Sequence, residues 1–362
     1  MFIVIYITFI FLILRFVVTL FNFISDPKLR RVNKQYTDFV SILVPARNEE
    51  SNILTLLISI LKQDYRDYEV IVLDDDSSDR TYEICAGFAS EYPAFRVIKG
   101  KELPAGWLGK NYACYQLAKE AKGNLFLFLD ADVRLHNGAI NSAVHRMYSG
   151  KLSLLSLFPN QQMGTLGEKA TIPLLHYGLL NLIPIRLVYL AKIAPASIGC
   201  GQFMFFEAGS YRQHQWHEKV KDKVVEDLEI MKQLVGSKLN GECLLANKLV
   251  SCRMYRGYGS ALRGLSKSAL AAFNYNLFSV LLYLLLLIAG PMIVLMTLNA
   301  NLIALMAGLV ILARTMISFM AGQNPLLNII LHPLQMLNFV LFSFISIQRH
   351  LTRTNVWKGR RI

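Results

Sequence analysis

Cysteine and acidic residues are scarce in this chain of 362 residues, and both shortages exclude classes of protein. The five cysteines are odd in number and form no Cys-x-x-Cys pair, so we expect free thiols in a reducing compartment rather than zinc sites or disulfides. No Asp or Glu follows Glu242, and the net charge is +13. No nucleic-acid-binding motif accompanies this charge, so nucleic acid is not an expected partner.

Long apolar runs are abundant by contrast, and the first one opens the chain. Phe2–Ile24 is almost continuously apolar, with Arg15 as its only charge. It has neither the basic start nor the small-residue cleavage site of a signal peptide, so we predict a retained membrane anchor over residues 1–24. Basic residues between positions 28 and 34 follow directly. By the positive-inside rule they place the next domain on the cytoplasmic side of the cell membrane.

Three further apolar runs predict a multi-pass membrane protein, with C-terminal membrane segments over residues 271–348. Three complete spans would leave the basic tail, residues 349–362, on the outer side, against the positive-inside rule. One run is therefore expected to be re-entrant or interfacial, and the last is the candidate because His332-Pro333 interrupts it. The surrounding basic residues favour contact with anionic lipid headgroups. The runs are Asn276–Leu298, Leu302–Met320 and Leu326–Ile347.

Strands alternate with helices over residues 25–270, which predicts an α/β domain with a mostly parallel sheet and helices on both faces. Within it, the central part of residues 165–195, Thr171–Lys192, is apolar but broken by Pro173 and Pro184. Helices lying in the membrane interface and a buried core helix are both open interpretations of that stretch. The predicted strands are Phe39–Val44, Tyr68–Leu73, Phe95–Ile98, Leu125–Leu129, Leu152–Leu157 and Gly199–Phe206.

The central strand of this sheet ends in two acids. Five apolar residues, Leu125–Leu129, read as a strand buried on both faces, and Asp130 and Asp132 follow it. Ligands of open α/β sheets bind at this end of the strands. Neighbouring carboxylates repel each other unless a cation lies between them, and their hard oxygens suit Mg²⁺ or Mn²⁺ bound with substrate phosphates. The pair predicts a metal–diphosphate site, although such pairs also occur by chance in loops.

Three other motifs surround this acid pair in a fixed order. Val40–Glu49 reads VSILVPARNE, Val72–Asp79 reads VLDDDSSD, and Glu226-Asp227 opens a predicted helix. With Asp130-Ala131-Asp132 they resemble the motifs of family 2 glycosyltransferases, which have the GT-A fold of nucleotide-diphospho-sugar transferases. A finer resemblance, to membrane-anchored carotenoid and hopanoid-associated glycosyltransferases, rests on Gly109–Gln116, Arg253-Met254-Tyr255 and Trp357–Arg360.

The resemblance implies a UDP-sugar donor and residues that would hold its nucleoside. Pro45, Ala46, Arg47 and Glu49 lie where the loop after the first strand meets the nucleoside in that family. Asp75 resembles the acid that accepts a hydrogen bond from the uracil N3–H. A solvated acidic turn is the alternative interpretation of this stretch.

The resemblance also assigns the diphosphate and metal contacts. Asp130 would contact ribose or sugar beside the metal, and Asp132 would bind the Mg²⁺ or Mn²⁺ that bridges the diphosphate. Lys110 could place a point charge on the same phosphates, or it could be a surface lysine at a helix start. Asp76 stands where the family usually has Gly, at a position that favours positive φ.

Asp227 resembles the catalytic base of an inverting reaction, in which a carboxylate takes the proton of the acceptor as it displaces UDP. Its alternative role is an acid that stabilises the N-terminus of its own helix. If the acceptor is a carboxylic acid that is already ionised, the base matters less.

The predicted function is transfer of a single sugar from a UDP-sugar to a membrane lipid, with a carotenoid or another polyisoprenoid as acceptor. Processive polysaccharide synthases are one alternative, but their Gln-x-x-Arg-Trp motif is missing, and Arg263–Lys267 occupies the comparable place without tryptophan. A catalytically silent membrane scaffold is the other alternative. Tyr255, Tyr258, Arg263 and Lys267 are candidates for the acceptor entrance, or form an aromatic and basic fringe at the membrane surface.

Overall fold

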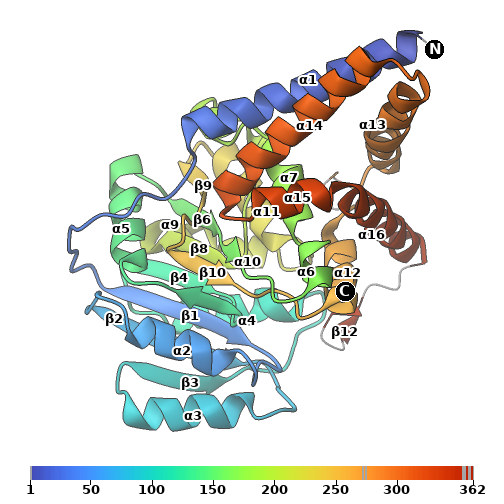
Figure 1. The fold of residues 1–362 in the computed structure, drawn as a ribbon. Coiled ribbons are helices and arrows are strands. Elements are labelled where there is room, and N and C mark those ends of the chain that lie inside the picture. Colours follow the sequence, from blue (N-terminus) through green and yellow to red (C-terminus); the bar gives the residue numbers. More distant parts are fainter. Residues whose placement is uncertain (1, 271–272, 274, 353–355, 358–359, 362) are drawn as a thin grey trace.

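The main sheet lies at the centre of the computed structural model, which describes residues 2–270, 273, 275–352, 356–357 and 360–361 (Figure 1). Its strands run in the order β3-β2-β1-β4-β8-β6-β9. All neighbouring strands are parallel except β8, which is antiparallel to both β4 and β6. The strands are β1 (Val40–Ala46), β2 (Tyr68–Asp74), β3 (Phe95–Lys99), β4 (Leu125–Leu129), β6 (Leu154–Phe158), β8 (Phe203–Glu207) and β9 (Gly241–Leu245).

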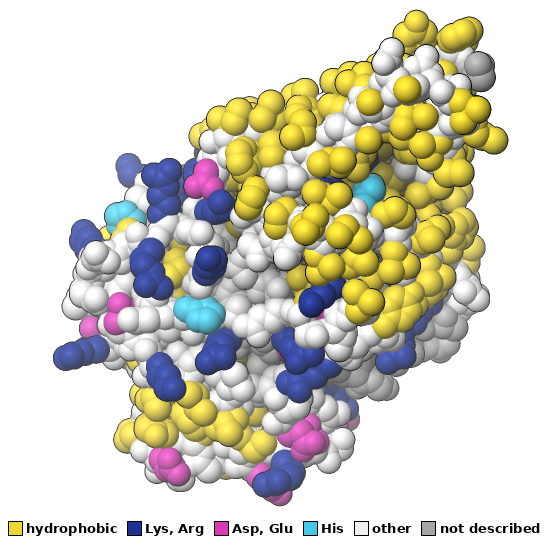
Figure 2. All heavy atoms as spheres, in the orientation of Figure 1, with side chains coloured by type: hydrophobic (Ala, Val, Ile, Leu, Met, Phe, Trp, Pro, Cys, Tyr) yellow, Lys and Arg dark blue, Asp and Glu magenta, His cyan; other side chains and the backbone are white. Residues whose placement is uncertain are grey.

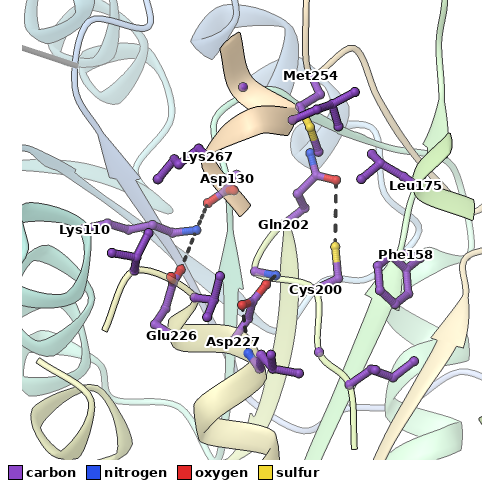
Figure 3. A pocket seen from close by; sticks show the side chains of 18 of the residues that line it. Lys110, Asp130, Phe158, Leu175, Cys200, Gln202, Glu226, Asp227, Met254 and Lys267 are labelled. Carbon is purple, nitrogen blue, oxygen red and sulfur yellow. Dashed lines mark hydrogen bonds and ion pairs between the residues drawn. The ribbon is translucent and has the colours of Figure 1, made fainter. Parts of the chain in front are cut away.

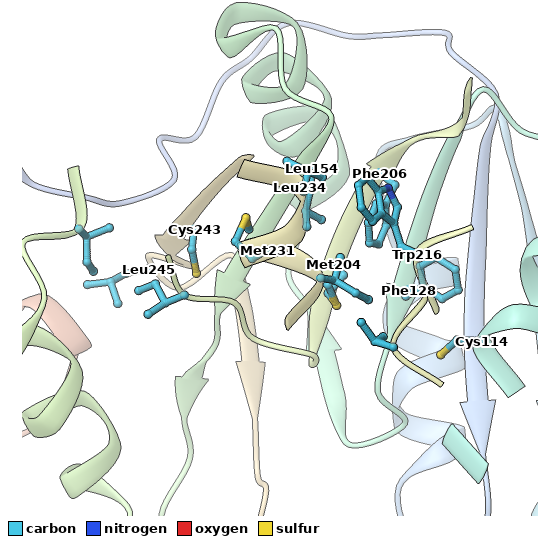
Figure 4. Close-up of a cluster of buried hydrophobic side chains, with 14 of the residues drawn as sticks. Cys114, Phe128, Leu154, Met204, Phe206, Trp216, Met231, Leu234, Cys243 and Leu245 are labelled. Carbon is cyan, nitrogen blue, oxygen red and sulfur yellow. The ribbon is translucent and has the colours of Figure 1, made fainter. Parts of the chain in front are cut away.

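Both faces of this sheet are buried, which confirms the mostly parallel α/β architecture predicted from the apolar runs. Leu43 and Phe128 belong to one hydrophobic cluster, whereas their chain neighbours Ile42 and Leu127 belong to the cluster on the opposite face. Figure 4 shows part of the first cluster, to which Trp216 and Phe206 both belong. The covering helices are α2 (Ile53–Leu61), α3 (Thr81–Glu91), α4 (Gly109–Glu120), α5 (Ala139–Gly150), α9 (Ala208–His214), α10 (Trp216–Lys219) and α11 (Glu226–Gly236).

A smaller sheet continues from the acid pair. It consists of β5 (Val133–Leu135), β10 (Val250–Cys252) and β7 (Asn160–Gln161), in the order β5-β10-β7. β10 is antiparallel to β5, so Cys252 lies opposite Val133, the residue that follows Asp132. The chain that leaves β10 therefore begins beside the acid pair. It continues into α12 (Tyr258–Ser268).

Within the described residues, three helices are long and apolar enough to cross a membrane: α1 (Phe2–Ser25), α13 (Leu277–Met296) and α14 (Ala300–Ala321). The last apolar run forms α15 (Pro325–Ile330) and α16 (His332–Thr352), and neither meets that criterion. Figure 2 shows hydrophobic side chains over the part of the surface where these helices lie, and most Lys and Arg of this face outside it. In the predicted basic tail, Val356–Trp357 (β11) pairs with Arg360–Arg361 (β12), while Arg353 and Lys358 lie outside the described residues.

The broken apolar stretch forms α6 (Leu166–Lys169), α7 (Pro173–Leu182), α8 (Ile185–Leu190) and a short 3₁₀ helix (Ala194–Ala196). α7 packs against both α1 and α14. Asn22 of α1 joins the break at Pro184, because its Nδ2 donates to the Leu180 and Ile183 carbonyls, at 2.9 and 2.8 Å, and its Oδ1 accepts from the Ile185 N–H at 3.0 Å. This amide satisfies backbone groups that the helix break would leave without partners. Whether α7 and α8 meet a membrane interface stays a prediction.

Candidate active site

One cavity of about 810 Å³ lies at the carboxyl ends of β1, β2 and β4. In parallel strands these ends meet at one edge of the sheet, so loops far apart in sequence converge there. The cavity is lined by every residue for which the sequence predicts a donor, metal or catalytic role. These residues are Pro45, Ala46, Arg47, Glu49, Asp75, Lys110, Asp130, Asp132 and Asp227.

The loops after β1 and β2 are tied together at one end of this cavity. The Asp75 N–H donates to the Ala46 carbonyl at 2.8 Å, and Arg47 Nη1 donates to the Asp75 carbonyl at 2.5 Å. Arg47 Nη1 also lies 3.4 Å from Asp76 Oδ2. Asp76 has φ of 58°, the left-handed conformation in which Gly is favoured and Asp is tolerated. The two loops thus form one hydrogen-bonded edge that includes the predicted nucleoside contacts.

Lys110, in the first turn of α4, is a bridge between two acids. Its Nζ lies 2.8 Å from Asp130 Oδ1 and 2.9 Å from Glu226 Oε1, and Figure 3 shows it between them. Burial opposes the charged form, but the two carboxylates raise the pKa of Lys110 well above its usual value. The side chain is therefore a charged internal partner of the acids. The sequence suggested phosphate contact or a surface position, and Glu226 was not predicted to be its partner.

Asp132 has one carboxylate oxygen that is free to bind a ligand. Its Oδ1 is buried and has no hydrogen-bond partner in the structure. Burial, followed by the charges of Asp130 and Glu49, raises the pKa of Asp132 to about 7. A carboxylate with one unpartnered oxygen and a pKa near neutral pH fits a hard divalent cation at this position.

The described residues around Asp132 do not form a metal site made of protein ligands alone. Among the described residues, no group of three or more His, Cys, Asp or Glu side chains is arranged to hold a metal ion. Mg²⁺ commonly takes one or two carboxylates and completes its shell with phosphate oxygens and water. The acid pair fits that pattern, with Asp132 as the available ligand and Asp130 held by Lys110.

Asp227 is fixed at the start of α11 by two backbone donors. Its Oδ2 accepts from the Gly201 N–H at 2.7 Å, and its Oδ1 accepts from the Leu228 N–H at 2.8 Å. Burial and then Glu226 raise the pKa of Asp227 to about 6. The chain opposite has no room for a side chain at Gly199, since a Cβ there would lie 2.5 Å from the Asp227 carbonyl oxygen. The geometry leaves an ionisable carboxylate facing the cavity from a rigid backbone.

Gln202 and Cys200 line the cavity and Cys252 lies next to it, and none of the three was assigned a role from the sequence. Gln202 Nε2 donates to Cys252 Sγ at 2.7 Å, and Cys200 Sγ donates to Gln202 Oε1 at 3.8 Å. A continuous strand over Gly199–Phe206 was predicted, but β8 begins only at Phe203, which leaves Cys200 and Gln202 in the preceding loop. The two glycines of this loop were the available signal. All five cysteines are described, buried and free, as predicted.

The other end of the cavity is apolar. Figure 3 shows Phe158 and Leu175 on the side of Gln202 away from the charged cluster. Its walls come from α7, α12 and α16, which are widely separated in sequence. Further lining residues at this end are Leu174, Leu179, Leu182, Ile183, Leu265, Ala269, Phe339 and Phe342.

The predicted acceptor-entrance residues do not share one place. Tyr255 and Lys267 line the cavity. Tyr258 instead donates from its hydroxyl to Asn338 Oδ1 at 2.7 Å, and the Arg263 carbonyl accepts from Arg349 Nη1 at 3.1 Å. The last two residues therefore join α12 to α16 and are not among the lining residues.

Comparison with known proteins identifies the domain that carries this site. Residues 41–213 match the model of glycosyl transferase family 2. The chain carries a family 2 glycosyltransferase domain. A mannosyltransferase from Pyrobaculum calidifontis, solved in complex with GDP-Man and Mn²⁺, has a similar fold with a TM-score of 0.56 at 16% identity, covering 97% of this chain and 100% of that one. The fold is GT-A, as the sequence motifs implied.

Curated relatives of this family 2 domain share one printed name. The chain is 29% identical over 242 residues to the 4,4'-diaponeurosporenoate glycosyltransferase of Staphylococcus haemolyticus, covering 64% of this chain. It is 34% identical over 142 residues to the enzyme of that name from Staphylococcus aureus (strain bovine RF122 / ET3-1), covering 39% of this chain. These matches span 61% of the first relative and 36% of the second.

Proposed function

We propose that the protein transfers one sugar from a UDP-sugar to a membrane-embedded lipid, with inversion and with help from a divalent cation. The observation that carries the proposal is the cavity itself. Its charged end lies at the carboxyl ends of the strands, where GT-A domains carry their acid pair. Its apolar end is walled by α7 and α16, and α7 packs on candidate membrane spans. A nucleotide sugar suits the first end and a lipid the second.

The donor would be held by the loop edge after β1 and β2. Asp75 would accept from the uracil N3–H, a group that cytosine lacks, while Ala46, Arg47 and Glu49 would border the nucleoside. Asp132 and Asp130 would hold Mg²⁺ or Mn²⁺, which when bound offsets negative charge on the departing diphosphate. Lys110 keeps Asp130 and Glu226 in place and limits the net negative charge that the diphosphate would meet.

The transfer step would be a direct displacement. The acceptor oxygen attacks the anomeric carbon, the bond from that carbon to the diphosphate oxygen breaks, and its electron pair leaves with UDP. Asp227 takes the acceptor proton when the acceptor is a hydroxyl. A base with a pKa of about 6 is ionised at neutral pH and still close to the operating range. An ionised carboxylate acceptor would need no proton removal.

The apolar end and the names of the curated relatives support this acceptor class. A polyisoprenoid such as a carotenoid acid is an apolar chain with an oxygen nucleophile at its end. It could reach the charged end from the membrane while its chain stays in apolar surroundings. The absence of the Gln-x-x-Arg-Trp motif supports a single transfer.

The test is incubation of membranes that contain the protein with a panel of UDP-sugars, followed by mass spectrometry of the lipid extract. We expect one lipid class to gain the mass of one sugar, and the gain to require a divalent cation. A ladder of several added sugars would instead support a processive synthase. Absence of both transfer and UDP binding would support a silent scaffold.

A further inference from the structure

The loop between β10 and α12 is fastened at both ends to one buried carboxylate, that of Glu168 in α6. Its Oε1 accepts from the Gly257 N–H at 2.7 Å and from Arg253 Nη2 at 3.1 Å. Its Oε2 accepts from the Gly164 N–H at 2.6 Å. These donors outweigh burial and lower the pKa of Glu168 to about 2, so the carboxylate stays ionised. The loop over residues 253–257 is therefore held in one conformation by a side chain that does not line the cavity.

This loop presents Tyr255 to the cavity. The ring lies against Gly264 of α12, where a Cβ would come within 2.2 Å of ring atoms Cε1 and Cζ. Real Cβ atoms do not approach so closely, so only glycine allows the ring to occupy this position. The ring is therefore clamped between its own loop and the backbone of α12.

The position of Tyr255 is the junction between the two ends of the cavity. Cys252, three residues earlier, hydrogen-bonds to Asp132 at the charged end. The Tyr255 ring itself lies against Gly264, whose chain neighbour Leu265 lines the apolar end. Burial, followed by the charge of Asp132, raises the pKa of Tyr255, so its hydroxyl is neutral at physiological pH.

We propose that Tyr255 forms the wall that directs the reactive end of an apolar acceptor toward the donor, and that Glu168 acts as a positioning residue through the loop. The ring presents an apolar face at the place where the acceptor chain must leave the apolar end. Tyr255 thus contributes to acceptor binding and leaves donor binding to the loop edge after β1 and β2. This inference rests on the proposed function and concerns the acceptor half of the same site.

Steady-state kinetics in detergent or lipid nanodiscs, with lipid acceptor varied at saturating UDP-sugar, tests the assignment. Tyr255→Ala is expected to raise the acceptor KM about tenfold, the range for losing an apolar contact in a pocket. UDP affinity by calorimetry should not change. Tyr255→Phe keeps the ring and should behave as wild type. Tyr148→Ala, on the exposed side of α5 and outside the cavity lining, is the matched control.

Gly264→Ala should displace the Tyr255 ring while the tyrosine itself is retained. This variant tests the proposal even if Tyr255→Ala does not fold. It is expected to raise the acceptor KM, and the double variant should be no worse than Tyr255→Ala alone, since the added methyl then has space. Glu168→Gln should also raise the acceptor KM while kcat at saturating acceptor and UDP affinity are retained.

Several outcomes would overturn the assignment. They are an unchanged acceptor KM in Tyr255→Ala, equal losses in the Phe and Ala variants, a UDP affinity that falls with the acceptor affinity, or additive effects of the Tyr255 and Gly264 changes. A wild-type protein that transfers no sugar and binds no UDP would refute the proposed function instead, and the two failures are thereby distinguished.

Discussion

The two ends of the cavity are built by different means. The charged end is formed where β1, β2 and β4 finish, and the register of adjacent parallel strands fixes its residues. The apolar end is formed by helices that are held by side-chain hydrogen bonds, such as that from Asn338 Nδ2 to the Ala170 carbonyl at 3.0 Å. Donor binding should therefore depend on the edge of the sheet and on the helix starts next to it. Acceptor binding should depend on how the helices next to the membrane are packed.

The largest effect should come from the charged end. Asp132→Asn removes the available metal ligand but keeps the size of the side chain. We expect transfer to fall at least about 10³-fold, as when electrostatic stabilisation of a leaving group is lost. The measurement is product mass spectrometry on membranes, with circular dichroism and membrane fractionation as controls for folding. Transfer at the wild-type rate would remove the metal role from Asp132.

A second effect at the charged end should appear in the pH dependence. Asp227 and Asp132 have pKa values of about 6 and about 7, and both must lose a proton to act as base and ligand. Activity should therefore fall as pH drops below about 7, approaching tenfold per unit once one of these groups is mostly protonated. Because metal and proton compete for Asp132, a higher Mn²⁺ concentration should move this limb to lower pH. A rate that is flat between pH 5 and 8 would contradict both assignments.

The apolar end should respond in KM alone. Leu179→Trp places a larger side chain on the cavity face of α7. We expect the acceptor KM to rise about tenfold while UDP affinity stays constant, since the added bulk lies away from the sheet edge. Leu190→Trp, on the exposed surface of α8, is the matched control. Equal changes in donor and acceptor binding would show that the two ends are not independent.

The difference between the ends also explains how far the sequence could predict this site. Asp130 was predictable because it directly follows a short apolar strand, whereas the roles expected for Asp75 and Asp227 came from the resemblance to family 2 glycosyltransferase motifs. The partner of Lys110 was not predictable, because Glu226 is brought near it only by the tertiary fold. The same holds for Gly264 and Tyr255, whose contact no periodicity encodes.

The fold shows the same division. Apolar runs predicted the buried parallel strands, but an apolar run carries no direction, so the antiparallel orientation of β8 was not foreseen. The short strands β9 and β10 were missed because Gly241–Leu245 and Val250–Cys252 lack clear alternation. The helices of the apolar end were predicted as apolar segments. Their grouping around one cavity was not predictable, because it depends on packing that composition does not specify.

The smallest expected effect is a change in the free energy of unfolding that depends on pH at the charged end and not at the apolar end. The folded protein raises the pKa of Asp132 from 3.8 to about 7, so ionising this group in the absence of metal costs folding free energy. That cost is absent below about pH 4, grows up to about pH 7 and is complete above it. Asp132→Asn should therefore raise the free energy of unfolding of metal-free protein by about 1–3 kcal/mol at pH 8 and by much less at pH 4.5. Thermal unfolding at the two pH values measures this, with Leu190→Trp as a variant that should show no such pH dependence. If Asp132→Asn stabilised the protein equally at both pH values, ionisation of Asp132 would not cost folding free energy. The charged end would then not differ from the apolar end in the pH dependence of its stability.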